Sequence, residues 1–363
     1  MKITRRRFFA AGGLSAAVLT STDSAEAQRQ RPQTPQPGRA AYWAPGPDLK
    51  APRREIKPGA TRVRLAARGL NWPPRENAGA NAPRDLESAL KMLRDQGLSA
   101  FVTRAAQWEN ASEATISELR AALKQYDMEI FEVGGYRNIL HPDASARQEN
   151  LKFLAKSLET CERIGCRQVG TITGSRNPEG NQWGDNYAVH EDNWTLETWK
   201  MAVNGIKQVL KDTAGLKAVI GMEAQVTTNL DGPIAHKNFI EDVGDPRCKV
   251  NLDPTNMIHL YNHFHTTEVL NQCFDLLGED IMGCHAKDTY VLPHSQTVHV
   301  QEVCPGRGRM DYETYILRLS NMKWPRALLA EHFPAEQNPE AYAYMRKVAA
   351  KVGVKIDMPP GNA

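Results

Sequence analysis

The stretch KVNLDPTNM (residues 249–257) contains a short apolar, β-branched run that ends on Asp253 and is followed at once by a proline. Runs of this composition are typical of buried strands, and Pro254 cannot continue a strand in the middle of a sheet. An aspartate at such a boundary can form a turn, cap a helix or bind a ligand. Asp253 alone does not distinguish these roles. Similar strand-like runs elsewhere in the chain, and the residues at which they end, are needed to distinguish them.

Seven more runs of the same kind occur between residues 61 and 355. Amphipathic segments such as DLESALKMLRDQG (85–97) separate them, with apolar residues at i, i+3, i+4 and i+7. Strands that alternate with helices pair in parallel, and eight such units predict an α/β fold, a single (β/α)8 TIM barrel. An open doubly wound sheet would normally have a glycine-rich loop after the first strand, where this chain reads ARGLNWPPREN. The predicted strands are 62–67, 99–104, 128–133, 167–173, 217–223, 248–253, 281–287 and 326–331.

Residues 1–27 have the features of an export signal. Paired arginines precede Phe8 and Phe9, an apolar stretch continues to Leu19, and Ala25-Glu26-Ala27 matches a cleavage site. This segment resembles a twin-arginine signal, so we predict export by the twin-arginine (Tat) machinery and a periplasmic or secreted protein. The apolar stretch is shorter than the ~20 residues that span a bilayer, so no membrane association is expected after cleavage.

The remaining composition sets the domain organisation. Residues 28–60 are rich in Pro, Gln and Arg and predict a flexible linker before a barrel at 61–355. With 363 residues and 41% hydrophobic content, the chain can bury a large core, and its net charge of +3 gives no support for a nucleic-acid partner. The six cysteines show no C-x-x-C pair, which favours buried free thiols. A homo-oligomer is compatible with the sequence.

Four predicted strands end on a residue that can bind a metal ion. The carboxyl ends of barrel strands form one rim, so these four side chains are expected to face one another. Each alone has an ordinary explanation as a turn, cap or core residue. Together, three carboxylates on one rim would repel one another without a cation between them. We therefore predict one divalent ion, Mn²⁺ first and Mg²⁺, Co²⁺ or Zn²⁺ as alternatives. The predicted ligands are Glu223, Asp253, His285 and Glu331.

With three further motifs, this pattern resembles the sugar phosphate isomerase/epimerase family of xylose isomerase-like TIM barrels. The motifs are L-D-P-x-N around Asp253, H-x-K-D at 285–288 and G-x-G-x-x-D at 306–311. In that family the residues that match the four predicted ligands bind one divalent metal, and those that match Glu223 and Glu331 also act as the acid/base pair. The resemblance implies a metal-dependent isomerase or epimerase that acts on a small carbohydrate by proton transfer through an enediolate.

Three alternatives stay open. A lyase or dehydratase would act on keto-sugars or 3-keto-glycosides by β-elimination or hydration, if the second carboxyl protonates a leaving oxygen. Predicted export favours it, because sugar phosphates are scarce outside the cytoplasm. A non-catalytic periplasmic sugar-binding barrel is opposed by the presence of both glutamates. An endonuclease IV-like phosphodiesterase needs extra histidines early in the barrel, and no histidine precedes His141.

The predicted substrate-binding residues lie beside the ligands. Many family members carry D-x-x-H on the sixth strand, and here the place of that histidine is taken by Asn256. Its amide can bind a hydroxyl but cannot transfer a proton near neutral pH. Arg307 can equally be a solvated side chain of a loop. Lys287 and Asp288 can equally be an ordinary ion pair at the end of a strand. The predicted set is Asn256, Lys287, Asp288 and Arg307, with Arg68, Glu132 and Trp183 as further candidates to line the pocket.

Overall fold

The computed structural model describes residues 54–70, 83, 85–180, 184, 187–294 and 296–361. The predicted signal peptide (1–27) and residues 28–53 of the predicted linker lie outside this part of the chain, and both stay predictions. Among the described helices, none is long and apolar enough to cross a membrane.

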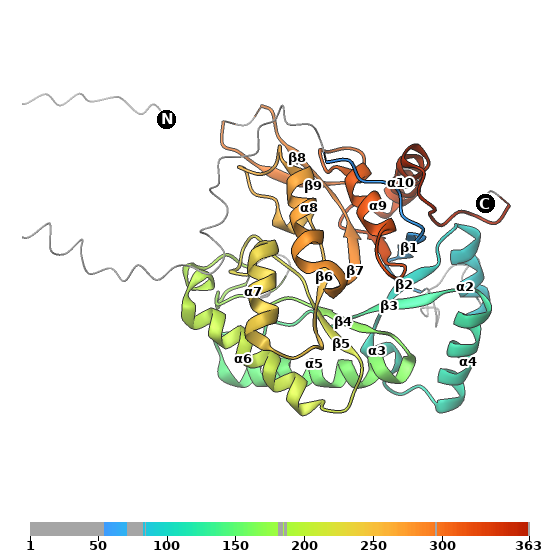
Figure 1. The fold of residues 1–363 in the computed structure, drawn as a ribbon. Coiled ribbons are helices and arrows are strands. Elements are labelled where there is room, and N and C mark those ends of the chain that lie inside the picture. The colour runs from blue at the N-terminus through green and yellow to red at the C-terminus, as the bar shows by residue number, and fades with distance from the viewer. Residues whose placement is uncertain are drawn as a thin grey trace, which may run out of the picture. The chain divides into compact units, whose positions relative to one another are not determined.

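Eight parallel strands close into a barrel, which confirms the predicted fold (Figure 1). The order around the barrel is β1-β10-β7-β6-β5-β4-β3-β2, so the first and last barrel strands pair with each other. Each of the eight predicted strands is present, within two residues of its predicted bounds. The strands are β1 Arg64–Ala67, β2 Ala100–Arg104, β3 Glu129–Gly134, β4 Gln168–Thr171, β5 Val219–Met222, β6 Cys248–Leu252, β7 Ile281–Ala286 and β10 Ala327–Ala330.

A two-stranded antiparallel sheet interrupts the alternation after β7. It consists of β8 (Asp288–Val291) and β9 (Val300–Val303). The predicted strands 281–287 and 326–331 are further apart in the sequence than the two preceding pairs of predicted strands, but the sequence analysis did not predict this hairpin. Its first residue follows Lys287 directly, so the hairpin begins at the same rim as the predicted metal ligands.

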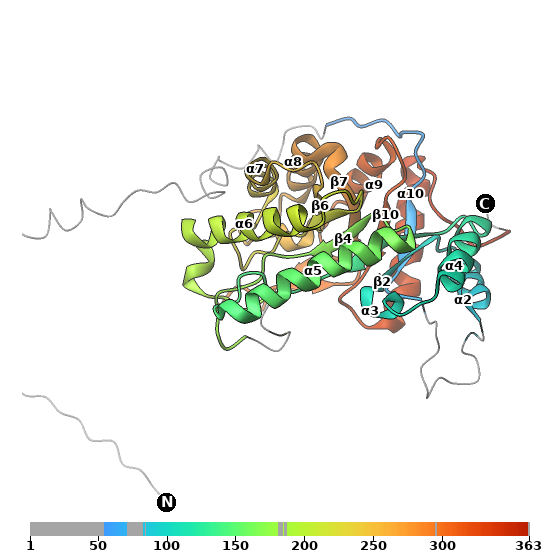
Figure 2. The ribbon, with the colours of Figure 1, turned by 90° about the horizontal axis from the view of Figure 1, so that it is seen from below.

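Helices cover the outside of the barrel, and neighbours such as α5 and α6 pack side by side (Figure 2). Most buried apolar side chains lie between these helices and the strands, and a smaller cluster around Phe131 fills the barrel interior. The α-helices are α2 Leu86–Asp95, α3 Ala105–Trp108, α4 Glu113–Gln125, α5 Ala144–Ile164, α6 Leu196–Asp212, α7 Pro233–Val243, α8 Thr266–Leu277, α9 Tyr312–Ser320 and α10 Asn338–Val352. Short 3₁₀ turns are η2 Glu191–Trp194, η3 Thr255–Met257, η4 Gly278–Asp280 and η5 Ala335–Gln337.

The end of the predicted linker contacts the barrel. The Gly59 N–H donates a hydrogen bond to Ser320 Oγ (2.9 Å), and the Lys57 carbonyl accepts one from Asn321 Nδ2 (3.0 Å). Contacts with the barrel therefore begin before residue 61. All six cysteines are buried and free, as predicted.

A buried histidine, His236 on α7, holds the strand that ends at Glu223. Its Nε2 lies 2.9 Å from the Met222 carbonyl oxygen, to which only a protonated Nε2 can donate. The side chain is fully buried, and burial lowers the pKa of His236 from 6.5 to about 4. The neutral imidazole is therefore the form that the fold accommodates.

We expect His236 to make the protein less stable in acid. Because the folded pKa of about 4 lies below the ordinary value of 6.5, the unfolded chain binds the proton more readily, and stability falls as pH falls from 6.5 to 4. The full effect is about 3 kcal/mol. Denaturant unfolding across this pH range should show a shallower loss in His236→Gln than in wild type. His299→Gln, on an exposed histidine, is the matched control; equal slopes in all three proteins would contradict the assignment.

Candidate metal centre

The four predicted ligands meet at one rim of the barrel. Glu223, Asp253 and Glu331 directly follow β5, β6 and β10, and His285 lies within β7. These strands are consecutive neighbours in the barrel. One donor atom from each of the four side chains lies within 4.8 Å of the others. His285 Nδ1 is 2.9 Å from Glu331 Oε1, and 3.5 Å from both Glu223 Oε2 and Asp253 Oδ2.

Two of these donor atoms have no well-directed hydrogen bond within the described part of the chain. They are His285 Nδ1 and Asp253 Oδ2, both in side chains that are at most 2% exposed. Asp253 Oδ2 already contacts Lys287 Nζ at 2.6 Å, so the clearer sign of a missing partner is His285 Nδ1, a buried nitrogen that faces three carboxylates. One imidazole and three carboxylates suit a divalent cation, and the residues present therefore fit such an ion.

The carboxylates of the cluster differ strongly in pKa. Burial raises the pKa of Glu223 to about 7. Burial also acts on Glu331, but the charges of His285 and Lys287 outweigh it and hold the pKa of Glu331 well below its ordinary value. The pKa of Asp253 is likewise lowered, because Lys287 offsets the effect of burial. Without an ion, Glu223 is thus the carboxyl that most readily keeps a proton.

Lys287, a predicted substrate-binding residue, is a fully buried ammonium at the centre of this rim. Its Nζ lies 2.6 Å from Asp253 Oδ2 and 3.4 Å from Glu331 Oε1. It also donates to the Asn256 Oδ1 atom at 3.2 Å. Burial would lower the pKa of Lys287, but the surrounding carboxylates raise it well above its ordinary value. The ammonium therefore balances part of the negative charge of the ligand set.

Asn256 joins two of the site residues. Its Nδ2 donates to Glu223 Oε1 at 2.6 Å, and its Oδ1 accepts from Lys287. The Tyr136 hydroxyl donates to the other Glu223 oxygen at 2.7 Å. The contacts found for Asn256 hold the Glu223 carboxylate in place, and its predicted contact with substrate stays a prediction.

Asp288 organises a loop. Its Oδ1 accepts from the N–H groups of Thr289 and Met310, and its Oδ2 from those of Gly306 and Gly308, all at 2.7–3.0 Å. A Cβ at Gly308 would lie 2.4 Å from Asp288 Oδ1, which explains the second glycine of the G-x-G-x-x-D motif. The motif therefore builds the loop before α9, and a substrate contact of Asp288 stays a prediction.

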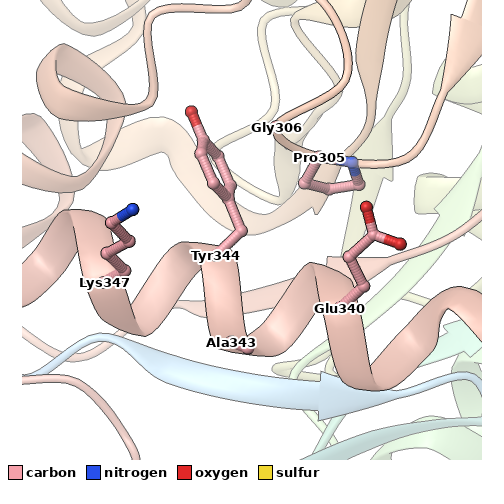
Figure 3. A pocket seen from close by; sticks show the side chains of 6 residues that line it. All are labelled: Pro305, Gly306, Glu340, Ala343, Tyr344 and Lys347. Carbon is pink, nitrogen blue, oxygen red and sulfur yellow. The ribbon is translucent and has the colours of Figure 1, made fainter.

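Arg307 lies on the outer side of the same loop. Its Nε and Nη2 atoms donate to Glu340 at 2.8 and 2.5 Å, and both side chains are about half exposed. Glu340 lines a hollow of about 300 Å³ between α10 and the loop, together with Pro305, Gly306, Ala343, Tyr344 and Lys347 (Figure 3). None of the four ligand residues lines this hollow. The contacts of Arg307 are those of a surface ion pair.

Several residues near the ligands were missed or were only pocket candidates in the sequence. His332 has a left-handed backbone (φ 64°), and its Nδ1 lies 3.0 Å from both Lys287 Nζ and Glu302 Oε2. The hairpin strand β9 supplies Glu302, so the insertion contributes directly to the rim. The others are Tyr136, which is partly buried, and the buried residues Asn251 and Glu132, and these three contact the predicted ligands or one another. Arg68 contacts Phe333 instead, and Trp183 lies outside the described residues.

Comparison with known proteins agrees with this architecture. A family model described as "Xylose isomerase-like TIM barrel" matches residues 90–348. No curated protein matches the sequence.

Three solved structures illustrate the range of similar barrels. A xylose isomerase-like TIM barrel protein from Mycobacterium smegmatis, in complex with magnesium, is 18% identical, with a TM-score of 0.56 over 80% of this chain and 97% of its own. An L-ribulose 3-epimerase is 16% identical, with a TM-score of 0.55 over 80% and 93%. A probable 3-DHS dehydratase from Bacillus anthracis is 14% identical, with a TM-score of 0.56 over 79% and 99%. At these identities the similarity establishes the fold.

Proposed function

Because the chain belongs to the xylose isomerase-like TIM barrel family, we propose that it is a metal-dependent sugar isomerase or epimerase, exported from the cytoplasm. One observation carries the proposal: Glu223 and Glu331 approach one metal-binding cluster from strands that are separated by β6 and β7. Two carboxyl groups placed this way can reach a bound sugar from different sides. One can remove a proton beside a carbonyl group while the other returns it.

A divalent ion bound by Glu223, Asp253, His285 and Glu331 would supply positive charge next to the oxygens of a sugar during proton transfer. We favour Mn²⁺, with Mg²⁺, Co²⁺ and Zn²⁺ as alternatives. Glu331, the carboxylate whose pKa is held low, is the group we assign as base. Glu223, with a pKa raised to about 7, is assigned as the group that returns the proton. Asn256 and Tyr136 fix the orientation of Glu223 through their hydrogen bonds.

A lyase or dehydratase acting on keto-sugars or 3-keto-glycosides is the second candidate. It needs a carboxyl group that delivers a proton to a leaving hydroxyl or glycosidic oxygen, and Glu223, whose pKa is raised in the metal-free site, is the candidate for that role. The similar barrels include both an epimerase and a probable dehydratase. Predicted export supports a substrate without phosphate. Both candidates use the same side chains and differ in where the second proton goes.

Incubation in D₂O distinguishes the two reactions. The purified protein, loaded with Mn²⁺, is incubated with a panel of free ketoses and 3-keto-glycosides and then removed together with the ion before NMR. We expect deuterium at carbon and an isomeric product of unchanged formula. An unsaturated or hydrated product would instead establish the lyase. No exchange with any member of the panel would contradict both and favour a sugar-binding barrel.

The metal site can be tested without a substrate. Protein purified without chelator should contain about one divalent ion per chain, and chelation should lower its thermal stability, because an ion that binds only the folded state stabilises it. Protein that holds no divalent ion and does not bind added Mn²⁺ would contradict the proposed centre.

A further inference from the structure

A further carboxylate, Glu132, lies behind His285 on the side away from the metal-binding cluster. Glu132 Oε2 is 3.4 Å from His285 Nε2, whereas His285 Nδ1 faces the three ligand carboxylates. Glu132 is 1% exposed. Asn251 Nδ2 donates to Glu132 Oε2 at 2.7 Å and lies 3.2 Å from His285 Nε2, and the Tyr136 hydroxyl, which donates to Glu223 Oε2, lies 3.2 Å from Glu132 Oε1. The carboxylate is thus held in place by neutral donors and turned toward one imidazole.

An irregularity in β3 brings Glu132 into the barrel. Phe101 pairs with Ile130 but Val102 pairs with Glu132, so Phe131 is an extra residue in the ladder. Phe131 belongs to the interior cluster, and in regular alternation the next side chain would point outward. The β-bulge resets the alternation, so Glu132 also points inward. Bulges of this kind occur beside active sites, where they redirect a side chain.

The neighbouring strand leaves space for this carboxylate. A Cβ at Gly170 on β4 would lie 2.5 Å from the carboxyl carbon of Glu132, and 2.7 and 2.8 Å from its oxygens. Real Cβ atoms do not approach other atoms so closely. Two separate features therefore allow Glu132 to occupy this position. The bulge in β3 turns its side chain inward, and Gly170 leaves space for its carboxylate.

We propose that Glu132 is a positioning residue of the metal centre. A histidine that binds an ion through Nδ1 must carry its proton on Nε2, and Glu132 Oε2 is placed to accept that proton in a hydrogen bond. The contact fixes the ring orientation and makes Nδ1 a more basic ligand, and partners of this type commonly affect metal affinity about 10–100-fold. The proposal rests on the metal site of the proposed function, but not on which carbohydrate reaction follows.

Mn²⁺ affinity tests this role without any substrate. Isothermal titration of metal-free protein should give a dissociation constant about 10–100-fold higher in Glu132→Ala than in wild type, with partial recovery in Glu132→Gln, whose amide oxygen still accepts. Gly170→Ala keeps the charge of Glu132 but displaces it, and should weaken binding as well. Glu129→Gln is the matched control, because Glu129 is on the same strand and pairs with Arg64 away from the site.

NMR of the histidine ring gives a second measurement. In Mg²⁺-loaded protein labelled with ¹⁵N-histidine, the His285 Nε2 proton should be shifted downfield and protected from exchange in wild type, and should lose both properties in Glu132→Ala. If circular dichroism shows that Glu132→Ala is unfolded, Glu132→Gln and Gly170→Ala decide the matter.

The outcomes separate this proposal from the proposed function. Wild-type affinity in both Glu132→Ala and Gly170→Ala, or an equal loss in Glu129→Gln, would overturn the role of Glu132. A wild-type protein that binds no divalent ion would overturn the metal site instead. In that case the Nε2 proton of the metal-free protein decides: its protection in wild type and loss in Glu132→Gln support the contact, and its absence in wild type overturns it.

Discussion

Glu331→Gln is expected to slow deuterium exchange and turnover by about 10²–10⁴-fold, the usual contribution of a positioned proton-transfer group. The substitution keeps the size of the side chain and an oxygen that can face the ion, but an amide cannot accept a proton near neutral pH. Glu331 is the carboxylate whose pKa is held well below its ordinary value by His285 and Lys287. An ionised carboxylate can accept a proton, so the substitution removes the group that we assign as the base.

The measurement must separate catalysis from metal loss, because Glu331 is also a predicted metal ligand. Rates are compared at saturating Mn²⁺, with occupancy measured in the same samples. Glu340→Gln, in the surface pair with Arg307, is the matched control and should behave as wild type. A rate within about tenfold of wild type at full occupancy would exclude Glu331 as the base.

Glu223→Gln distinguishes the two proton-transfer roles. If Glu331 removes the proton and Glu223 returns it, this variant should still exchange the substrate proton with solvent while forming little isomeric product. Loss of exchange in Glu223→Gln together with retained exchange in Glu331→Gln would reverse the assignment.

The sequence predicted the barrel and the grouping of the four ligand-capable side chains for the same physical reason. Barrel strands end at one rim, so Glu223, Asp253, His285 and Glu331 could be grouped without knowing any distance. Asn251 could also have been found, because it lies two residues before Asp253 on the same strand and so faces the same side.

The direction of the Glu132 side chain, into or out of the barrel, could not be predicted from the sequence. Strict alternation through Phe131 would turn its carboxylate outward, and only the bulge in the β2–β3 ladder reverses this. Pairing irregularities depend on the neighbouring strand and leave little trace in one segment. The hairpin β8–β9 was also missed. Its link to the site is the contact between Glu302 and Lys287, and the sequence of the hairpin alone does not reveal a contact with another segment. Asp288 is a different case. It belongs to a motif that the sequence analysis identified, and its side chain accepts hydrogen bonds from backbone N–H groups of the loop before α9.

Lys287→Met should destabilise the metal-free protein by about 3–5 kcal/mol, the cost of removing one partner from a buried charged group. Lys287 is fully buried, and its Nζ lies within 3.4 Å of carboxylate oxygens of Asp253, Glu302 and Glu331. Methionine fills most of the same space without a charge. Asp253 and Glu331, which are largely buried, would then repel one another without this counter-charge, and Glu302, which is 40% exposed, would add to the repulsion.

Added Mn²⁺ should restore much of this loss, because the ion supplies the positive charge that the ammonium no longer provides. The increase in unfolding free energy on adding Mn²⁺ should therefore be larger in Lys287→Met than in wild type. Lys91→Met is the control: Lys91 pairs with Asp95 on the exposed face of α2, so its loss should cost no more than about 0.5 kcal/mol. Equal increments in wild type and Lys287→Met would show that ammonium and ion do not share the same carboxylates. A larger increase in unfolding free energy in Lys287→Met would show that two cations stabilise the same carboxylates in the folded protein. One is the Lys287 ammonium, which is part of the chain, and the other is the bound metal ion, which can exchange with solvent.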